Sequence, residues 1–205
     1  MDTRIGFGWD SHAFKAGVPL RIGGMTLDHP EGLAGHSDGD VLLHAITDAL
    51  LGAVAAGDIG SFFPPGDPRW KDADSAIFLK LALEELENAG YRIVNVDTTL
   101  ILAAPKIFPI AGDMRSHVAD LLGVDLDQVS IKAKTPEGLN LDHVAQCHAV
   151  ALVERTSDDD DLKSMTAVIE TQRQLEDVVE DLLSYVHGVP KKKTVLPMFD
   201  TEDIT

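Results

Sequence analysis

Residues 35–60, GHSDGDVLLHAITDALLGAVAAGDIG, place two histidines and four aspartates in a sequence that is otherwise small and apolar. Between Asp40 and Gly52, apolar residues fall on nearly every side of a helix, which predicts a buried helix. Asp40, His44 and Asp48 interrupt this apolar coat at i, i+4 and i+8, so they form one polar line along the helix. A buried charged group is costly unless it is paired, hydrogen-bonded or bound to a metal. The polar line therefore indicates a functional site.

The helix alone leaves two interpretations of this line open. In the first, Asp40 lies in the first turn, where a carboxylate suits the helix dipole, and His44 makes an ordinary hydrogen bond in the core. In the second, His44 is a metal ligand. One histidine and two aspartates make an incomplete zinc site, so the second interpretation requires ligands from elsewhere in the chain.

Further ligands are available near the N-terminus. Residues 4–9 alternate in the manner of a strand and lead into Asp10-Ser11-His12, where an extended backbone points the aspartate and the histidine to the same side. With His44 they provide two imidazoles and one carboxylate, the donor set of a catalytic zinc ion that keeps one position open. The two aspartates of the polar line, one turn to either side of His44, are candidates for orienting the ligand imidazoles.

Two weaker patterns are not interpreted as functional sites. Gly6 and Gly8 form a GxG, but no third glycine follows at the spacing of a dinucleotide-binding loop, and no helix pattern begins there. His143, Cys147 and His148 lie close together in the sequence. Strand alternation puts Cys147 and His148 on opposite faces, so we interpret them as ordinary strand positions rather than a second metal site.

Composition limits the class of protein. The 205 residues, 44% hydrophobic and 25% charged, suit one well-buried globular domain with an appendage. With 17 basic and 34 acidic residues, the net charge of −17 argues against nucleic-acid or anionic-membrane binding. A single cysteine excludes an internal disulfide and agrees with a reducing compartment. No apolar run is long enough to cross a bilayer and no export signal is recognised, so we expect a cytoplasmic protein.

The remaining pattern predicts an α+β fold, an α/β sandwich with helices packed on one face of a mixed sheet. We predict helices over residues 74–89 and 114–122, and strands over residues 93–103, 129–133 and 144–153. A hairpin is predicted over residues 19–27, turning at Gly23-Gly24. Residues 30–32 and 57–60 are predicted to be loops.

The character of the chain changes at Ser157, so we predict a domain over residues 1–156 and an acidic helical extension with a short tail over residues 157–205. Four aspartates at 158–161 favour a helix start, and a mostly one-sided apolar stripe follows them. We expect this helix to end near Gly188. The basic triplet at 191–193 is interpreted as a solvated or internally paired patch rather than a nucleic-acid-binding arm.

Several motifs occur in an order that is informative as a set. They are Asp10-Ser11-His12-Ala13-Phe14, Gly35-His36-Ser37-Asp38-Gly39-Asp40-Val41, the helix with His44 and Asp48, Gly57-Asp58-Ile59-Gly60, Asn95-Val96-Asp97, Ala104-Pro105-Lys106, Met114-Arg115 and Lys132-Ala133-x-Thr135-x-Glu137. Together they resemble the 2-C-methyl-D-erythritol 2,4-cyclodiphosphate synthase family, over residues 4–153. The resemblance implies a homotrimer whose sites lie between subunits, with zinc ligands from one chain and a cytidine loop from the next.

The resemblance also implies an activity, a lyase-type ring closure in the non-mevalonate route to isoprenoid precursors. The substrate is 4-diphosphocytidyl-2-C-methyl-D-erythritol 2-phosphate, whose C2 phosphate attacks the β-phosphorus and releases CMP. Such an in-line transfer needs positioning and charge neutralisation rather than a protein nucleophile, and no nucleophile motif is found. Two alternatives stay open: a non-catalytic trimeric homologue that binds metal and nucleotide, and a zinc-dependent phosphohydrolase.

Site roles follow from the same resemblance. It implies zinc, or another divalent transition metal, on Asp10, His12 and His44, and Mg²⁺ or Mn²⁺ on Glu137 together with the substrate diphosphate. It implies that His36 and Thr135 stabilise the transition state. The other substrate contacts that it implies are Ser37, Asp58, Ile59, Gly60, Phe63, Asp67, Ala103, Ala104, Pro105, Lys106 and Lys134, of which residues 103–106 form the cytidine pocket.

The chain also departs from the family pattern. Where three threonines usually precede the glutamate, it has Lys134, Thr135 and Pro136, which adds a cation and removes two hydroxyls. Val144 and Gln146 stand where the family has an arginine and a glutamate at the trimer axis. The isoprenoid diphosphate that this axis can hold in the family is therefore not expected to bind here. Residues 157–205 lie outside the resemblance.

Overall fold

The computed structural model describes residues 2–187, and within the last helix it describes the side chains of residues 168–180, 182 and 183 only. The expected helix end near Gly188 and the basic triplet at 191–193 therefore lie outside the described residues. The chain divides into two compact units, one that ends at Thr156 and one that begins at Ser157.

A five-stranded mixed sheet forms the centre of the first unit, and its strands lie in the order β4-β1-β7-β5-β6. These strands are β1 (Thr3–Ala16), β4 (Glu31–Leu33), β5 (Tyr91–Ile101), β6 (Val129–Lys134) and β7 (Val144–Arg155). β5 and β6 run parallel, whereas the other neighbouring pairs are antiparallel. β2 (Leu20–Ile22) and β3 (Met25–Leu27) form the predicted hairpin, and both residues of the Gly23-Gly24 turn have positive φ angles.

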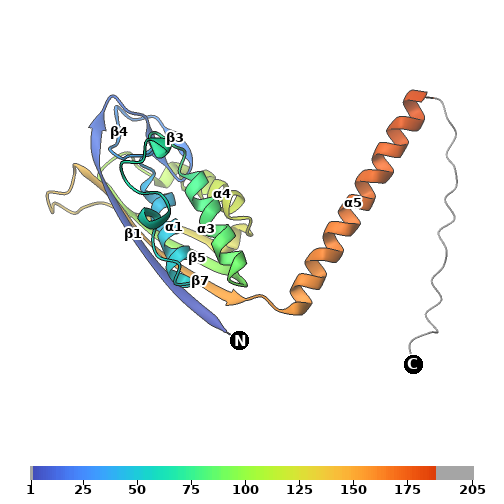
Figure 1. The fold of residues 1–205 in the computed structure, drawn as a ribbon. Helices are drawn as coiled ribbons and strands as arrows, with labels where there is room; N and C mark the ends of the chain where they lie inside the picture. The colour runs from blue at the N-terminus through green and yellow to red at the C-terminus, as the bar shows by residue number, and fades with distance from the viewer. Residues whose placement is uncertain (1, 188–205) are drawn as a thin grey trace. The chain divides into compact units, whose positions relative to one another are not determined.

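Three helices cover one face of the five-stranded sheet (Figure 1): α1 (Val41–Ala53), α3 (Ala76–Asn88) and α4 (Ala111–Leu122). Shorter elements connect them, namely α2 (Ile59–Phe62) and the 3₁₀ turns η1 (Pro68–Trp70), η2 (Phe108–Ile110) and η3 (Leu126–Gln128). The α+β fold predicted from the sequence, with helices on one face of a mixed sheet, is confirmed.

Helix α1 lies directly against β1. Eleven of its 13 residues are buried, as predicted for this stretch. A Cβ built on Gly6 would lie 1.7 Å from the carbonyl oxygen of Ala49, and one built on Gly8 would lie 1.9 Å from that of Ala45. Only glycine allows two backbones to approach so closely. The GxG pair therefore sets the contact between strand and helix.

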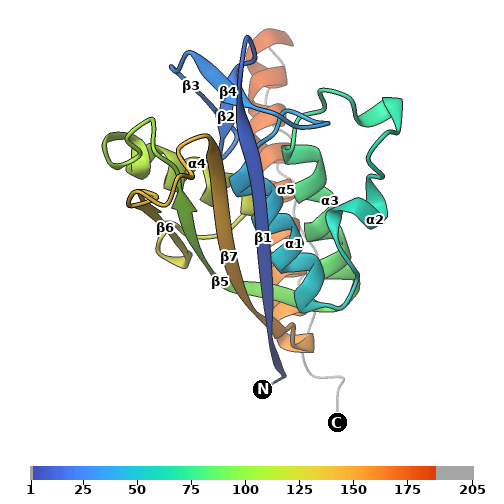
Figure 2. The ribbon, with the colours of Figure 1, turned by 90° about the vertical axis from the view of Figure 1, so that its left-hand side faces the viewer.

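The opposite face of the sheet carries none of the helices described for the first unit, and Figure 2 looks onto it. On this face Ile5, Phe7 and Trp9 are 70%, 60% and 49% exposed. The His148 ring lies 6.0 Å from the ring of Phe7 and 6.4 Å from that of Trp9, whereas Cys147 is buried toward the helices. The predicted placement of these two residues on opposite faces is thus confirmed. A row of large exposed apolar side chains is typical of an interaction surface.

Two predicted loops contain short regular elements. Residues 30–32 overlap β4, which pairs with the end of β1 so that Phe14 lies opposite Leu33. Residues 57–60 overlap α2, whose N-cap is Asp58. The loop predictions were wrong at these points because elements of three or four residues are too short to show a period.

The second unit begins with α5 (Asp158–His187), the predicted C-terminal helix. The described apolar side chains of α5 are between 48% and 63% exposed; they are Val168, Ile169, Leu175, Val178, Val179, Leu182 and Leu183. None of the described helices has both the length and the apolar character needed to span a membrane.

Candidate metal centre and substrate site

Three side chains from two elements meet near the N-terminal end of α1. β1 carries Asp10 and His12 on its helix-facing side, and α1 carries His44. Asp10 Oδ2 lies 2.8 Å from His12 Nε2 and 2.8 Å from His44 Nδ1, and these two nitrogens are 3.1 Å apart. Among the residues that the structure describes, this is the one group of histidine, cysteine and acidic side chains with converging ligand atoms. The sequence analysis predicted the same three residues.

The donor set fits a metal ion. Three atoms that can each offer a lone pair converge here, which is the arrangement that a three-ligand metal site provides. A tetrahedral zinc ion with bonds of about 2.0–2.2 Å keeps its ligand atoms about 3.3–3.6 Å apart, so the three atoms have to separate by only about half an ångström. The other oxygen of the carboxylate, Asp10 Oδ1, accepts a hydrogen bond from the Ser11 amide at 2.8 Å. Oδ2 therefore remains available for the ion.

The charges of these groups depend on one another. Burial alone would raise the pKa of Asp10, but the hydrogen bonds and charges of His12 and His44 outweigh it and hold this pKa well below its ordinary value. Burial alone would lower the pKa of His44, but the hydrogen bond and charge of Asp10 raise it above the ordinary value. The carboxylate and the imidazole thus each favour the charged form of the other.

The opposite nitrogen of His44 lies between two hydroxyl groups. Ser75 Oγ is 2.8 Å from His44 Nε2, and Ser37 Oγ is 3.1 Å from it. Ser75 donates hydrogen bonds to the Asp38 carboxylate from its hydroxyl and, at 3.1 Å, from its backbone amide. Ser37 was identified from the sequence, whereas Ser75 and Asp38 were not assigned a role. A serine just before a helix has the same pattern as an ordinary N-cap, so the sequence carries no distinctive signal for Ser75.

Asp40 does not orient an imidazole, contrary to one of the two sequence-based interpretations, and agrees with the other, which placed it at the start of the helix. It is fully buried and is the N-cap of α1, where its carboxylate accepts from the amides of Leu42 and Leu43 at 3.1 and 3.0 Å. The same carboxylate accepts from the amides of Gly23 and Gly24 at 2.9 and 2.6 Å. The prediction was wrong because these amides, two of them in a hairpin far away in the sequence, take the oxygens of Asp40.

The prediction for Asp48 was wrong for a similar reason. Asp48 Oδ1 accepts a hydrogen bond from the Ile59 amide at 2.8 Å, which ties α2 to α1. Burial and the nearby charge of Asp58 raise the pKa of Asp48. Asp58 itself accepts from the Ser61 amide at 2.8 Å and from the Ser61 hydroxyl at 2.7 Å, and these hydrogen bonds lower its pKa. Asp58, Ile59 and Gly60 are thereby held beside α1.

Two other residues identified from the sequence meet beside this centre. His36 Nε2 lies 3.0 Å from the carbonyl oxygen of Asp67. The carboxylate of Asp67 accepts from Arg69 Nε at 3.0 Å and from Arg69 Nη2 at 2.6 Å, which holds the pKa of Asp67 below its ordinary value. Phe63 is buried, and the centroid of its ring lies 4.3 Å from that of the Phe78 ring. For Phe63, the backbone is therefore the part that remains for a ligand.

A second group of expected site residues lies where β5 and β6 end. Parallel strands end at the same edge of a sheet, and the Leu102 amide donates to the Lys134 carbonyl at 3.1 Å. The group consists of Ala103, Ala104, Pro105 and Lys106 after β5, with Lys134 at the end of β6 and Thr135 and Glu137 after it. Lys106, Lys134, Thr135 and Glu137 are exposed, and the Thr135 hydroxyl donates to the Glu137 carboxylate.

The two groups lie level with one another across the sheet but on different strands. Ser11 of β1 pairs with Gln146 of β7, which pairs with Ile101 of β5. At about 4.8 Å per strand, β1 and β5 are about 10 Å apart. No hydrogen bond or ion pair between the two groups is found in the part of the chain that the structure describes. The candidate metal centre and the candidate nucleotide loops therefore lie on different strands of the same sheet.

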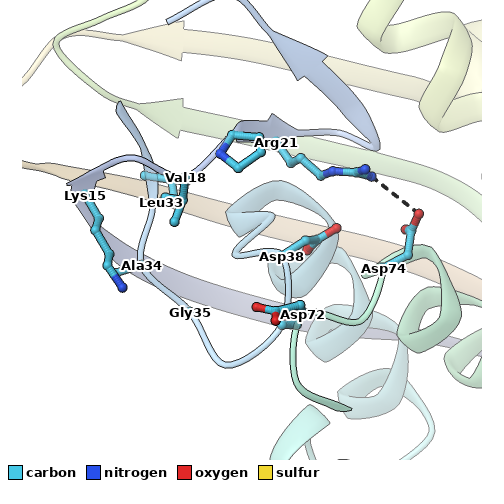
Figure 3. Close-up of a pocket in the computed structure, with 11 residues that line it drawn as sticks. Lys15, Val18, Arg21, Leu33, Ala34, Gly35, Asp38, Asp72 and Asp74 are labelled. Carbon is cyan, nitrogen blue, oxygen red and sulfur yellow. Dashed lines mark hydrogen bonds and ion pairs between the residues drawn. The ribbon is translucent and has the colours of Figure 1, made fainter. Parts of the chain in front are cut away.

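A pocket of about 310 Å³ lies beside the loop that precedes α1 (Figure 3). Lys15 and Arg21 line one part of it and three aspartates, Asp38, Asp72 and Asp74, line another. Arg21 Nη1 is 3.4 Å from the carboxylate of Asp74. The three metal-binding candidates are not among its lining residues. The pocket therefore adjoins the candidate metal centre through Ser37, which contacts His44, and does not coincide with it.

Comparison with known proteins identifies the family of this chain. The model of the YgbB family matches residues 3–154. The chain belongs to the YgbB family. The 2-C-methyl-D-erythritol 2,4-cyclodiphosphate synthase of Koribacter versatilis (strain Ellin345) is 62% identical over 152 residues, which are 74% of this chain and 98% of that protein. The synthase of Moorella thermoacetica (strain ATCC 39073 / JCM 9320) is 52% identical over 136 residues, 66% of this chain and 83% of that protein.

Solved structures agree with this assignment to the YgbB family. A structure of 2C-methyl-D-erythritol-2,4-cyclodiphosphate synthase in a CDP-bound form is 38% identical, with a TM-score of 0.70 over 74% of this chain and all of that one. Both groups of site residues fall within the range that the YgbB family model matches, whereas α5 lies beyond it. The family resemblance inferred from the motifs is thus confirmed.

Proposed function

We propose that this chain converts 4-diphosphocytidyl-2-C-methyl-D-erythritol 2-phosphate into 2-C-methyl-D-erythritol 2,4-cyclodiphosphate and CMP. The observation that carries the proposal is the convergence of Asp10, His12 and His44 in a chain that is 62% identical to a protein named for this activity. An oxygen of the 2-phosphate forms a bond to the β-phosphorus. The bond from this phosphorus to the oxygen shared with the CMP phosphate breaks, and CMP leaves with that oxygen.

The residues present suit two kinds of cation. Asp10, His12 and His44 would hold Zn²⁺ or another divalent transition metal, because imidazole and carboxylate form a zinc-type donor set. Glu137 would hold Mg²⁺ or Mn²⁺ together with the substrate diphosphate, since such ions are commonly bound by one or two carboxylates plus phosphate oxygens. These ions supply charge neutralisation and polarisation of the phosphate oxygens.

The other side chains bind and orient the substrate. The Ser37 hydroxyl would donate to a phosphate oxygen beside the metal centre, and Asp58 would accept hydrogen bonds from methylerythritol hydroxyls. His36 and Thr135 would stabilise the charge that develops on the phosphate oxygens in the transition state. Lys134 would add a positive charge beside the diphosphate.

Nucleotide recognition belongs to the loop after β5. Ala103, Ala104, Pro105 and Lys106 would surround the cytidine. The existence of a CDP-bound form of a related synthase supports binding of a cytidine nucleotide. Ile59, Gly60, Phe63 and Asp67 would complete the substrate contacts on the side of α2.

We further propose that the active enzyme is a homotrimer whose sites lie between subunits. Within one chain the metal centre and the cytidine loop lie on strands about 10 Å apart with no described hydrogen bond or ion pair between them, so a neighbouring chain could supply the complementary group to each. Ile5, Phe7 and Trp9 supply an exposed apolar surface suited to subunit packing. A cytoplasmic location stays a prediction.

The proposal is tested by incubating the full chain with Zn²⁺, Mg²⁺ and the substrate, and following the products by ³¹P NMR. We expect signals of a cyclic diphosphate and CMP to grow together. Linear hydrolysis products would instead favour a zinc-dependent phosphohydrolase, and unchanged bound substrate would favour a non-catalytic binding protein. Protein treated with a chelator and returned to metal-free buffer serves as the control.

A further inference from the structure

We propose that Ser75 and Asp38 are positioning residues that fix which nitrogen of His44 carries the proton and so direct His44 Nδ1 toward the metal. This inference rests on the metal centre of the proposed function. It adds two residues that neither the motifs nor the comparisons assign. The general reason is that a ligand histidine needs a partner on its other nitrogen to hold its tautomer and ring orientation.

The direction of the hydrogen bonds follows from the chemistry of the three groups. A carboxylate has no hydrogen to donate, so Asp38 can only accept. The single hydroxyl hydrogen of Ser75 points to Asp38, and the Ser75 amide adds a second hydrogen bond of 3.1 Å. The Ser75 oxygen must therefore accept at its 2.8 Å contact with His44 Nε2. His44 Nε2 then carries a hydrogen, and Nδ1 is left to bind a metal.

Ser75 does not make the capping hydrogen bond that is usual for a serine at its position. It is the N-cap of α3, where a serine oxygen commonly accepts from an amide two or three residues later. Its side chain makes no such capping bond, and the Ala76 amide donates instead to Asp74 Oδ1 at 2.9 Å. Ser75 is also fully buried. Its hydroxyl is thus committed to His44 and Asp38.

The same arrangement separates the roles of the two serines near His44. His44 Nε2 has one hydrogen, and the closer, buried Ser75 oxygen receives it at 2.8 Å rather than Ser37 Oγ at 3.1 Å. Ser37 is only partly buried. The hydroxyl hydrogen of Ser37 is consequently available to a phosphate, as the proposed function requires.

Asp38 is itself held in place from two sides. Its carboxylate accepts from the Asp40 amide at 3.2 Å, and its own amide donates to the carbonyl of Ala73 at 3.0 Å. The second of these bonds joins the loop before α1 to the loop before α3. A variant could therefore act through the loops alone, so the test needs a measurement that reports on His44 itself.

The first measurement is zinc affinity of the full chain at neutral pH, in competition with a chromogenic chelator. We expect Ser75→Ala to weaken zinc binding by roughly 10- to 100-fold. The matched control is Thr47→Val on α1, because Thr47 is equally buried and its hydroxyl donates to the Leu43 carbonyl at 2.8 Å. Thr47→Val should bind zinc as the unaltered chain does. Equal affinity of Ser75→Ala and the unaltered chain would overturn the inference.

The second measurement is the ¹⁵N–¹H NMR spectrum of the histidine rings in the zinc-loaded chain. We expect a slowly exchanging Nε2–H signal for His44, which becomes fast-exchanging in Ser75→Ala and stays slow in Thr47→Val. A purely structural role of Ser75 would leave this signal unchanged and would overturn the inference.

Two further outcomes need to be told apart: a Ser75→Ala variant that does not fold, and an unaltered chain that binds no zinc. If Ser75→Ala does not fold, Asp38→Ala replaces it, because this variant keeps the Ser75 hydroxyl but frees its hydrogen to turn toward His44. Weakened zinc binding together with loss of the slowly exchanging His44 Nε2–H signal in Asp38→Ala would support the inference. Unchanged binding, or weakened binding with this signal unchanged, would overturn it. If the unaltered chain binds no zinc, the metal centre of the proposed function fails and the inference fails with it. Zinc binding that is unaffected by the variants refutes the positioning role alone.

Discussion

At the scale of single residues, His44 is the ligand whose loss should separate metal binding from folding. Loss of a residue that supports a ligand typically weakens metal binding by up to roughly 100-fold. We expect His44→Ala to lower zinc affinity by more than this, because the substitution removes a ligand itself. The chain should stay folded at a cost of about 1–3 kcal/mol, because the shortened side chain leaves a cavity beside Phe78. Metal analysis after dialysis and circular dichroism test the two parts.

A matched histidine replacement provides the comparison. His148 lies on the open face of the sheet against Phe7 and Trp9, away from the three candidate ligands. His148→Ala should keep its full zinc content. Full zinc content in His44→Ala would contradict the ligand assignment.

A second residue-scale expectation concerns pH. Asp2 accepts from the Tyr91 hydroxyl at 2.7 Å and from Arg155 Nε at 3.0 Å, and these contacts lower its pKa below the ordinary value of 3.8. A carboxyl group with a lowered folded-state pKa stabilises the fold above its unfolded pKa, and the effect disappears as the pH falls through the folded value. Asp2→Asn should therefore unfold at lower urea than the unaltered chain at pH 7. The difference should shrink below about pH 4, and a constant difference down to pH 2 would contradict this linkage.

At the scale of secondary-structure elements, Gly6 and Gly8 set how closely β1 approaches α1. We expect Gly8→Ala to destabilise the chain by more than about 4 kcal/mol, because the added Cβ would overlap the carbonyl of Ala45. Gly112→Ala is the control, since a Cβ at Gly112 meets nothing within 4 Å and alanine favours a helix by about 0.5–1 kcal/mol. Urea unfolding compares them, and similar stability of the two variants would contradict the close contact.

Asp40 joins α1 to the hairpin of β2 and β3, so its replacement should affect both elements. Asp40→Ala removes the acceptor of four backbone amides, and we expect a loss of about 3 kcal/mol or more. Asp74→Ala removes the acceptor of one α3 amide and an exposed ion pair with Arg21 of β2, so it should cost only about 1 kcal/mol. Hydrogen exchange at Gly23 and Gly24 should accelerate in Asp40→Ala only.

The sequence was sufficient to predict the longer elements and insufficient for the contacts between them. The buried helix, the hairpin turn and the main strands follow from periodicity and glycine positions, which act locally. The place of Asp40 at the start of the helix was one of the two interpretations left open, whereas its bonds to the hairpin and the bond of Asp48 to Ile59 were missed because only the folded chain brings these amides near. The close contact at the GxG pair likewise depends on which helix packs against β1.

The same distinction between local pattern and long-range contact applies to the residues of the candidate site. Asp10, His12 and His44 were identified because donor types and spacing carry chemical information. Ser75 was missed because a serine before a helix has a common structural explanation, and its hydrogen bond to His44 spans 31 residues of sequence. The family resemblance supplied the remaining residues, and their roles stay predictions.

At the scale of the whole molecule, we expect the first unit to fold without the second. The first unit ends at Thr156, and the matched family region ends at residue 154. We expect a chain without residues 157–205 to keep its fold and its zinc content, as measured by circular dichroism and metal analysis. Loss of either would show that the first unit depends on the extension.

Sedimentation of both chains shows whether the exposed apolar side chains of α5 contribute to assembly, and identical profiles would exclude such a contribution.

The direct contact between the backbones of β1 and α1 has a consequence for how the protein can evolve or be redesigned. Gly8 lies two residues from Asp10 on the same side of β1, and its contact, Ala45, is the neighbour of His44. The distance between strand-borne and helix-borne ligands is thus determined by main-chain atoms rather than by the sizes of core side chains. Core residues elsewhere can change volume and alter stability while the ligand geometry stays constant. Mutational libraries of the core should accordingly yield variants with a wide range of stabilities and a narrow range of zinc affinities.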